Sequence, residues 1–251
     1  MKGIGTIINV LAVLLGGGAG MLLKNRMKSN TSVSGGRYQE ILMHALGVST
    51  MFIGISGTLK GMFTVNGGAL EASGSMLMII CLVLGSVLGE WIDIEKWMDR
   101  FGVWLRQKFG GKDDNQFVEG FVSASLVICI GAMAIVGALE DGLQGDPSTL
   151  IAKAILDAVI VMVFASSYGK GALFSAIQVG IWQVSITLFA RFLEPLLTDV
   201  IISDLSFVGN ALIFCVGINL AFGKHFRVGN MLPALIFVVL FDWMQGWIPF
   251  L

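Results

Sequence analysis

The chain has 251 residues, of which 55% are hydrophobic and 13% are charged, and its formal net charge is -1. Soluble domains carry roughly 25% charged residues, so this composition, with its long apolar blocks, indicates an integral membrane protein. The balanced charge and the lack of a basic tract with interleaved aromatic residues argue against a nucleic-acid partner. The cysteines lie far apart in apolar runs, without the spacing of a metal site.

Several segments are long and apolar enough to span a membrane, because a hydrocarbon core of ~30 Å needs about 20 helical residues. They lie at roughly 4–24, 39–60, 74–91, 118–139, 148–168, 172–193, 205–223 and 230–249. Their apolar residues are continuous rather than alternating, which favours helices over a β-barrel. The sequence therefore predicts one all-α domain over residues 1–251, a polytopic transmembrane helix bundle of seven or eight spans. The count stays open because a very tight turn joins 148–168 to 172–193.

The first segment has the outline of a signal peptide, but its positive flank lies after the apolar run. Its pattern returns in the seventh segment at one constant offset, which pairs Asn9 with Asn210, Gly16 with Gly217 and Gly20 with Ala221. This predicts an internal duplication of the kind found in transporters, with coincidence as the alternative. The run Gly16-Gly17-Gly18 favours close helix packing. A broken helix whose backbone coordinates an ion is the alternative.

The stretch 91–112, between the third and fourth segments, is amphipathic. Apolar residues recur there at helical spacing, with tryptophans beside them: Ile94, Met98, Phe101, Leu105, Phe109, Trp91, Trp97 and Trp104. We expect a helix on the membrane surface, and a helix that docks a partner protein is the alternative. Lys and Arg are concentrated in this loop and in every second loop before and after it. Such loops are typically cytoplasmic, so the sequence predicts that this loop is cytoplasmic and that both termini lie outside.

The fifth segment begins after the turn 145-GDPS-148. Asp146 suits the N-cap, and Pro147 suits the first helical position. This outer helix N-terminus, at Asp146 and Ser148, could instead offer free N–H groups to an anion. Glu140 and Asp141 are expected in the outer loop before it.

Lys153 and Asp157 lie four residues apart and share one face of the fifth segment. Asp157 is about 13–16 Å from the helix start, near the bilayer midplane, where a carboxylate costs roughly 2.5–3.5 kcal/mol. It is expected to face the bundle interior, either as a structural partner of Lys153 or as a group that binds a proton, cation or substrate. Lys153 is close enough to the outer surface for its side chain to snorkel.

Other polar side chains also lie at membrane depth: Asn9, Gln178, Gln183, Asn210, Asn219 and Asp242. Most such groups join helices through hydrogen bonds, and a few line a pathway for a substrate or ion. Asp242 is also close enough to the outer surface to be an interfacial residue beside Trp243.

The stretch 131–177, together with 229-GNMLPALI-236 and the N-terminal GTIINVLAVLLGGGAG, resembles the YdfK/YqgA family of bacterial inner-membrane proteins. The resemblance covers essentially the whole chain. It implies a multi-pass protein of the bacterial inner membrane, from a family of unknown function for which transport is a frequent suggestion. It implies no site residues.

Motifs of soluble enzymes are absent from the sequence. We therefore expect no enzyme activity, no cofactor and no metal. The sequence favours a transporter or channel for a small solute or ion, embedded in the lipid bilayer, with Asp157 in its pathway. The alternative is a non-transporting scaffold or sensor that docks a partner through residues 91–110. The glycine-rich helix faces leave a homo-oligomer open.

Overall fold

The structure is a computed structural model that describes residues 3–30, 35–66, 69–109, 116–129, 132–143, 145–193 and 198–245. Its helices are α1 (Ile4–Asn30), α2 (Gly35–Met62), α3 (Ser75–Ile92), α4 (Ile94–Phe109), α5 (Phe117–Cys129), α6 (Ala132–Leu143), α7 (Ser148–Tyr168), α8 (Lys170–Leu193), α9 (Asp199–Phe222), α10 (Val228–Met231) and α11 (Ala234–Gln245). Between α2 and α3, the strands β1 (Phe63–Asn66) and β2 (Ala69–Ala72) form a short antiparallel hairpin. The predicted all-α membrane bundle is confirmed, with this hairpin as an addition.

Most predicted spans correspond to single helices. Among the described residues, α1, α3, α7, α8 and α9 are long and apolar enough to cross a membrane. The predicted span 39–60 lies within α2, which has 28 residues. The predicted span 230–249 is represented by the shorter α10 and α11, and its last residues lie outside the described ranges. The described residues of the predicted span 118–139 belong to α5 and α6, on either side of residues 130–131, which lie outside the described ranges.

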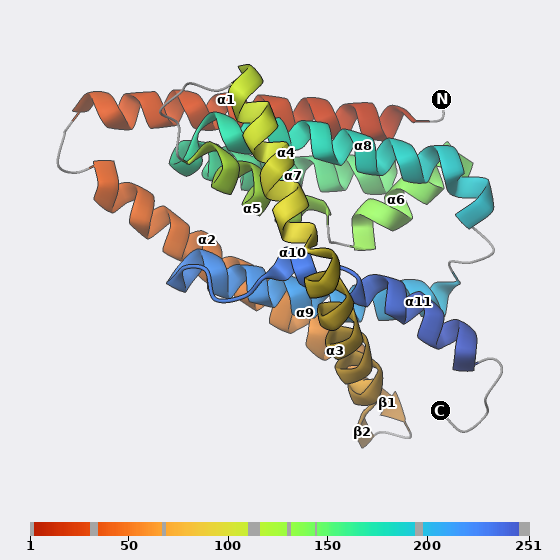
Figure 1. Cartoon of the computed structure of the whole chain (residues 1–251). Coiled ribbons are helices and arrows are strands. Elements are labelled where there is room, and N and C mark those ends of the chain that lie inside the picture. Colours follow the sequence, from red (N-terminus) through yellow and green to blue (C-terminus); the bar gives the residue numbers. More distant parts are fainter. Residues whose placement is uncertain are drawn as a thin grey trace.

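The helices form two layers, which α4 crosses on one side of the molecule (Figure 1). One layer holds α1, α5, α6, α7 and α8, and the other holds α2, α3, α9, α10 and α11. We name the two ends of the first layer by residues of α1. At the Gly3 end, α1 and α7 begin; at the Lys24 end, Lys24 donates a 2.8 Å hydrogen bond to the carbonyl oxygen of Ser167. The prediction that the Lys24 end is cytoplasmic stays a prediction.

Glycines set how closely α1 approaches α7. A Cβ atom at Gly16 would lie 2.2 Å from the carbonyl oxygen of Ala158, and one at Gly20 would lie 2.2 Å from that of Met162. Such distances are too short for any side chain, so glycine is what allows the two backbones to touch. Because α1 is continuous from Ile4 to Asn30, close packing is confirmed, and the alternative of a helix broken at these glycines is wrong.

The helix α9 packs against α2 in a different way. These two helices run antiparallel, with Gly47 against Ala221 and Gly61 against Phe207, whereas α1 and α7 run parallel. The two segments predicted to be duplicated therefore pack differently: α1 has a parallel partner and α9 has an antiparallel one. The duplication stays a prediction. The glycines that pack α1 and α2 do so within one chain, and a homo-oligomer likewise stays a prediction.

The predicted amphipathic segment forms the helix α4. Leu105 on its apolar face is 1% exposed, and the ring of Phe101 meets that of Phe121 on α5 edge-on at 5.7 Å between centroids. Trp97 remains exposed. Asp93 lies between α3 and α4 with a left-handed backbone (φ 56°), a conformation that ends one helix and lets the next begin. The placement of α4 on a membrane surface stays a prediction.

Candidate polar site in the membrane interior

The described residues of the fourth predicted span belong to α5, which is described to Cys129, and to α6, which is described from Ala132; residues 130–131 are outside the described ranges. Phe117, at the start of α5, lies beside Gly171 near the Lys24 end, and Asp141 of α6 lies beside Gly3. Ile128, in the last described turn of α5, is therefore in the apolar middle of the span, where a polar group needs a partner within the protein because lipid supplies none.

Lys153 of α7 supplies such a partner. Its Nζ donates to the carbonyl oxygen of Ile128 at 2.8 Å and to the two carboxylate oxygens of Asp157 at 2.7 and 2.6 Å. The side chains of Lys153 and Asp157 are 7% and 3% exposed. The predicted shared face is confirmed. The prediction that Lys153 snorkels to the outer surface is wrong, because its ammonium is held by acceptors in the interior.

Asp157 also joins α7 to α1. Its Oδ2 accepts a 3.1 Å hydrogen bond from Nδ2 of Asn9. A lone carboxylate at this depth would cost several kcal/mol, and the paired ammonium offsets much of that cost. The pair is neutral as a unit, and it connects three helices: α1 through Asn9, α5 through Ile128, and α7.

Asn9, Asp157 and Gln183 lie in one layer across the bundle. Each stands four residues from a buried valine of one apolar cluster: Asn9 from Val13, Asp157 from Val161 and Gln183 from Val179. Residues four apart share a helix face. Since α7 runs parallel to α1, and α8 runs antiparallel to it with Gly180 beside Val10, all three polar residues lie one turn nearer the Gly3 end than the valines. We call Asn9, Lys153, Asp157 and Gln183 the polar layer.

Several polar atoms at this layer have no hydrogen-bond partner within the described part of the chain. Gln183 is fully buried, and neither its Oε1 nor its Nε2 is bonded. The same is true of Oδ1 of Asn9 and of Oγ1 of Thr6, which lies one turn nearer the Gly3 end. Buried polar groups are nearly always hydrogen-bonded in native proteins. These unpaired groups therefore indicate a place that water or a polar ligand fills.

Two pockets lie toward opposite ends of the first layer. At the Gly3 end, a pocket of about 470 Å³ lies between α1, α6 and α8, with Thr6 and Thr187 in its lining. At the Lys24 end, a pocket of about 560 Å³ extends along α5 as far as Leu126. Asp157 lines neither of these pockets, so other side chains separate it from both.

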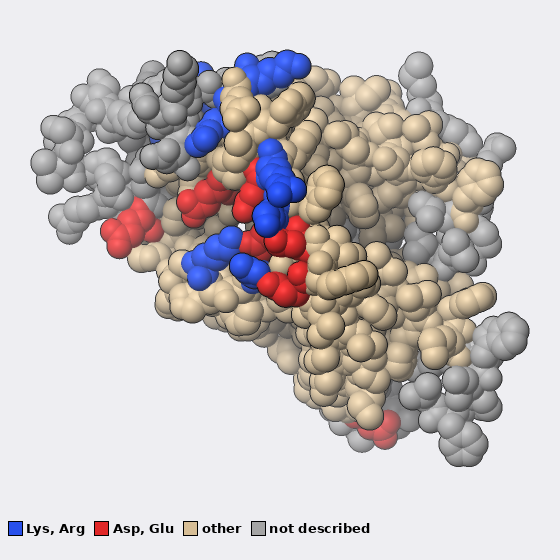
Figure 2. Space-filling model, in the orientation of Figure 1, with Lys and Arg blue, Asp and Glu red and all other residues tan. Residues whose placement is uncertain are grey.

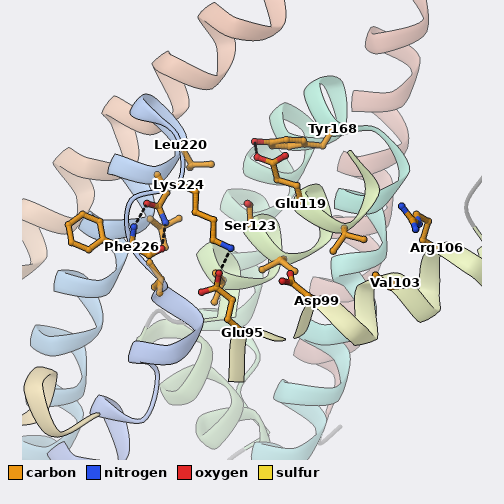
Figure 3. A pocket seen from close by; sticks show the side chains of 16 residues that line it. Glu95, Asp99, Val103, Arg106, Glu119, Ser123, Tyr168, Leu220, Lys224 and Phe226 are labelled. Carbon is orange, nitrogen blue, oxygen red and sulfur yellow. Dashed lines mark hydrogen bonds and ion pairs between the residues drawn. The ribbon is translucent and has the colours of Figure 1, made fainter. Parts of the chain in front are cut away.

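Charged side chains surround the pocket at the Lys24 end (Figures 2 and 3). Lys224 pairs with Glu95, and the hydroxyl of Tyr168 donates to Glu119 at 3.1 Å. Asp99 faces the same space, and burial raises the pKa of its carboxyl, an effect that Lys224 opposes. On the face shown in Figure 2, most of the charged side chains gather in one hollowed band, and the described residues to the right of it are uncharged. The pocket is therefore bordered by charged groups of both signs, and its lining follows α5 from Val118 to Leu126.

Asp141 is buried, although the sequence placed it in an exposed outer loop. Its carboxylate accepts hydrogen bonds from the backbone N–H groups of Gly3 at 3.1 Å, Gly5 at 3.0 Å and Thr6 at 3.4 Å. α6 continues to Leu143, which carries Asp141 to the start of α1. A carboxylate is stable there because the free N–H groups and the helix dipole attract negative charge.

The start of α7 differs by one residue from the prediction. The helix begins at Ser148, and Pro147 rather than Asp146 occupies the N-cap position. Asp146 still accepts a 3.0 Å hydrogen bond from the backbone N–H of Ser148 and another from its hydroxyl. These two bonds, the hydroxyl's first, lower the pKa of Asp146. The carboxylate already uses a group that was predicted to meet an anion, which argues against an anion site here.

Two other predicted pathway residues have local roles in α9. Asn210 donates to the carbonyl oxygen of Ser206 on its own helix at 2.7 Å. Asn219 holds the loop after α9, where its side-chain oxygen accepts the backbone N–H groups of His225 and Phe226 at 2.8 and 2.9 Å. Both residues are thus bonded to nearby backbone and lie outside the polar layer, although Asn219 also lines the pocket at the Lys24 end.

The remaining two candidates also lie apart from the polar layer. Gln178 is half-buried, and it is displaced by about 140° around α8 from Gln183. Asp242 of α11 lies near Asp204 of α9, and its Oδ2 is buried without a hydrogen-bond partner among the described residues. Sequence reasoning missed Asp204, because nothing in the spacing of the two residues signals that their helices meet.

Comparisons with known proteins agree with the sequence resemblance. The family DUF554, a protein family of unknown function, matches residues 4–243. The uncharacterized membrane protein YdfK of Bacillus subtilis (strain 168) is 30% identical over 232 residues, which cover 92% of each chain. The uncharacterized protein YqgA of Escherichia coli (strain K12) is 32% identical over 237 residues, which cover 93% of each chain. No solved structure matches. The YdfK/YqgA resemblance is confirmed.

Proposed function

We propose that this chain, which belongs to the DUF554 family of proteins of unknown function, moves a small solute or ion across its membrane. The observation that carries the proposal is the polar layer among α1, α5, α7 and α8. Lys153 bonds the Ile128 carbonyl oxygen of α5, and the fully buried Gln183 has polar atoms without partners among the described residues. Transporters commonly place their binding sites near the midplane of the bilayer.

The two pockets supply the approaches that such a pathway needs. The pocket at the Gly3 end reaches Thr6, one turn from Asn9, and the pocket at the Lys24 end reaches Leu126, two residues before Ile128 on α5. The polar layer between them is closed from both. In the proposed cycle this arrangement is the occluded state, and small movements of the short helices α5 and α6 open one side at a time.

We also propose that the protein lies in the bacterial inner membrane with both termini outside, so that the Lys24 end faces the cytoplasm. The support is the concentration of Lys and Arg in alternate loops, which marks cytoplasmic loops. The proposed transport needs no chemical step, so it includes no enzyme activity, no cofactor and no metal.

Exposed tryptophans on and beside α4 favour a second candidate, a scaffold or sensor. Trp91 is 84% exposed and Trp97 is 64% exposed. Aromatic anchors of this kind suit a protein partner as well as a membrane interface. A stoichiometric partner that is lost when Trp97 and Trp104 are replaced by alanine would support docking, and retention of the partner would argue against it.

The test of the transport proposal is flux through the purified protein in proteoliposomes, measured as solute uptake or as current on a solid-supported membrane. Wild-type protein is expected to carry flux above that of protein-free vesicles. Asp157→Asn is expected to change the rate or the selectivity of that flux. An Asp157→Asn variant that matches wild type at every pH would remove Asp157 from the mechanism.

A further inference from the structure

The two charged side chains of the polar layer neutralise one another. The Lys153 ammonium contacts both oxygens of Asp157, at 2.7 and 2.6 Å. α1 and α8 contribute the neutral amides of Asn9 and Gln183. A cation that enters would meet the ammonium, and an anion would meet the carboxylate, both in surroundings of low dielectric where such repulsion is strong. The layer as built is unsuited to ions of either sign.

The unpaired groups have a different chemistry. Gln183 offers two N–H donors and one acceptor, Asn9 offers its amide oxygen, and the Thr6 hydroxyl both donates and accepts. Such a mixture complements a molecule that itself carries hydroxyl or amide groups. The ion pair has no such spare capacity, because the ammonium uses its protons on Asp157 and on the Ile128 carbonyl.

The position of these groups limits how the ligand arrives and how large it is. Thr6 lines the pocket at the Gly3 end, so this pocket is the approach to the unpaired atoms. On the other side the valines Val13, Val161 and Val179, all buried, close the layer. The space for the ligand is therefore bounded by Thr6 one helical turn to one side of the layer and by the three valines one turn to the other side. This spacing restricts the ligand to a small molecule.

We propose that the substrate is a small uncharged molecule with hydroxyl or amide groups, which binds to Gln183, Asn9 and Thr6 from the Gly3 end, while the Lys153–Asp157 pair excludes ions of both signs. The inference rests on the proposed function and narrows it from "solute or ion" to one class. Lys153 and Asp157 are then positioning residues that hold α1, α5 and α7 around the site.

The first experiment compares uncharged solutes with ions on the same wild-type protein. Osmotic swelling of proteoliposomes measures entry of glycerol and of urea, and a planar bilayer in a potassium chloride gradient measures current. We expect entry of at least one of the two solutes above that of protein-free vesicles, without ionic conductance. Ionic current without solute entry overturns the inference and leaves the proposed function standing. The absence of both solute entry and current overturns the inference and the proposed function together.

The second experiment uses two glutamines of one helix as a matched pair. Gln183→Leu removes the unpaired amide and is expected to reduce solute entry roughly tenfold, the value of one hydrogen bond in binding. Gln178→Leu, on another face of α8, is the control, and its proteoliposomes are expected to swell at the wild-type rate. Equal effects of the two substitutions overturn the assignment of the site to Gln183.

The third experiment breaks the ion pair from each side. Asp157→Asn leaves the ammonium and is expected to admit anions, whereas Lys153→Met leaves the carboxylate and is expected to admit cations. The two reversal potentials in a potassium chloride gradient should shift in opposite directions. Shifts in the same direction, or none, overturn the role of the pair. Since a lone buried charge can prevent folding, Gln183→Leu, which keeps the pair, decides the proposal if neither variant reaches the membrane.

Discussion

Lys153 contacts Asp157 one turn further along α7 and, with the same ammonium, the carbonyl oxygen of Ile128 on α5. An (i, i+4) pair on one helix thus becomes a link between two helices. The link holds α5 to α7 at a depth where lipid offers no competing hydrogen bond.

The pair should show strong coupling in a double-mutant cycle. Lys153→Met and Asp157→Leu are each expected to lower the free energy of unfolding by about 3–5 kcal/mol, because each leaves a buried charge alone. The double substitution should cost less than either single one. Thermal unfolding in detergent measures all four proteins, and additive losses would contradict the coupling.

Gly16 and Gly18 offer a matched test of helix packing on α1. Gly16→Ala is expected to lower the free energy of unfolding by about 1–3 kcal/mol, since its Cβ would overlap the Ala158 carbonyl and force α7 away. A Cβ atom at Gly18 would have no heavy atom of another residue packed within 4 Å of it. Gly18→Ala should therefore raise stability by up to ~1 kcal/mol through helix propensity. Equal effects would mean that contact with α7 does not decide the residue.

Substitutions at Asp141 and at its neighbour Glu140 compare a carboxylate that bonds three backbone N–H groups with one that accepts a single hydroxyl. Asp141→Asn is expected to cost about 1–3 kcal/mol, because the carboxylate accepts three backbone N–H groups at the start of α1. Glu140→Gln should cost less, since Glu140 accepts the Thr149 hydroxyl and an amide oxygen still can. Hydrogen exchange at the first residues of α1 should increase for the Asp141 variant alone.

Two carboxyl groups outside the spans should give opposite responses to pH. Burial raises the pKa of Asp99, so the folded state holds that proton more tightly, and stability falls as pH rises through the interval above the ordinary pKa of 3.8. Bonds from Ser148 lower the pKa of Asp146, so its contribution is present above the ordinary pKa and is lost as pH falls through the lowered one.

The measurement is the unfolding midpoint as a function of pH for Asp99→Asn and Asp146→Asn. Asp99→Asn should remove part of the loss of stability at rising pH. Asp146→Asn should remove part of the loss at falling pH. Slopes that change in the same direction for the two variants would contradict the environments described for these side chains.

Membrane depth and the pairing of Lys153 with Asp157 could be predicted from the sequence, because both depend on local spacing. The third acceptor of Lys153, the Ile128 carbonyl oxygen, could not. It is a backbone group on another helix, and the stretch around it, 126-LVICIGAMAIVG-137, is apolar throughout. Nothing in the sequence therefore indicates that the Lys153 side chain turns toward the interior.

Which of the two glutamines of α8 belongs to the polar layer also depends on helix packing. Gln178 and Gln183 both lie in the apolar segment 172–193, and their residue type is identical. What separates them is which face of α8 meets α1, a property of the assembled bundle. Asp141 was misplaced for a related reason, since its partners are backbone groups at the start of the sequence, 135 to 138 positions away, and leave no side-chain pattern.

The anchoring of α1 by Asp141 has a consequence for how the protein is made. The carboxylate that completes the first helix is 138 positions away from Gly3 in the chain, so α1 enters the membrane during synthesis long before its acceptor has been translated. The N–H groups of Gly3, Gly5 and Thr6 must rely on water or lipid headgroups until α6 arrives. The first residues of α1 therefore gain their hydrogen-bond acceptor only after Asp141 has been synthesised. Nascent chains that stop short of Asp141 should be cleaved by proteases more readily at the beginning of α1.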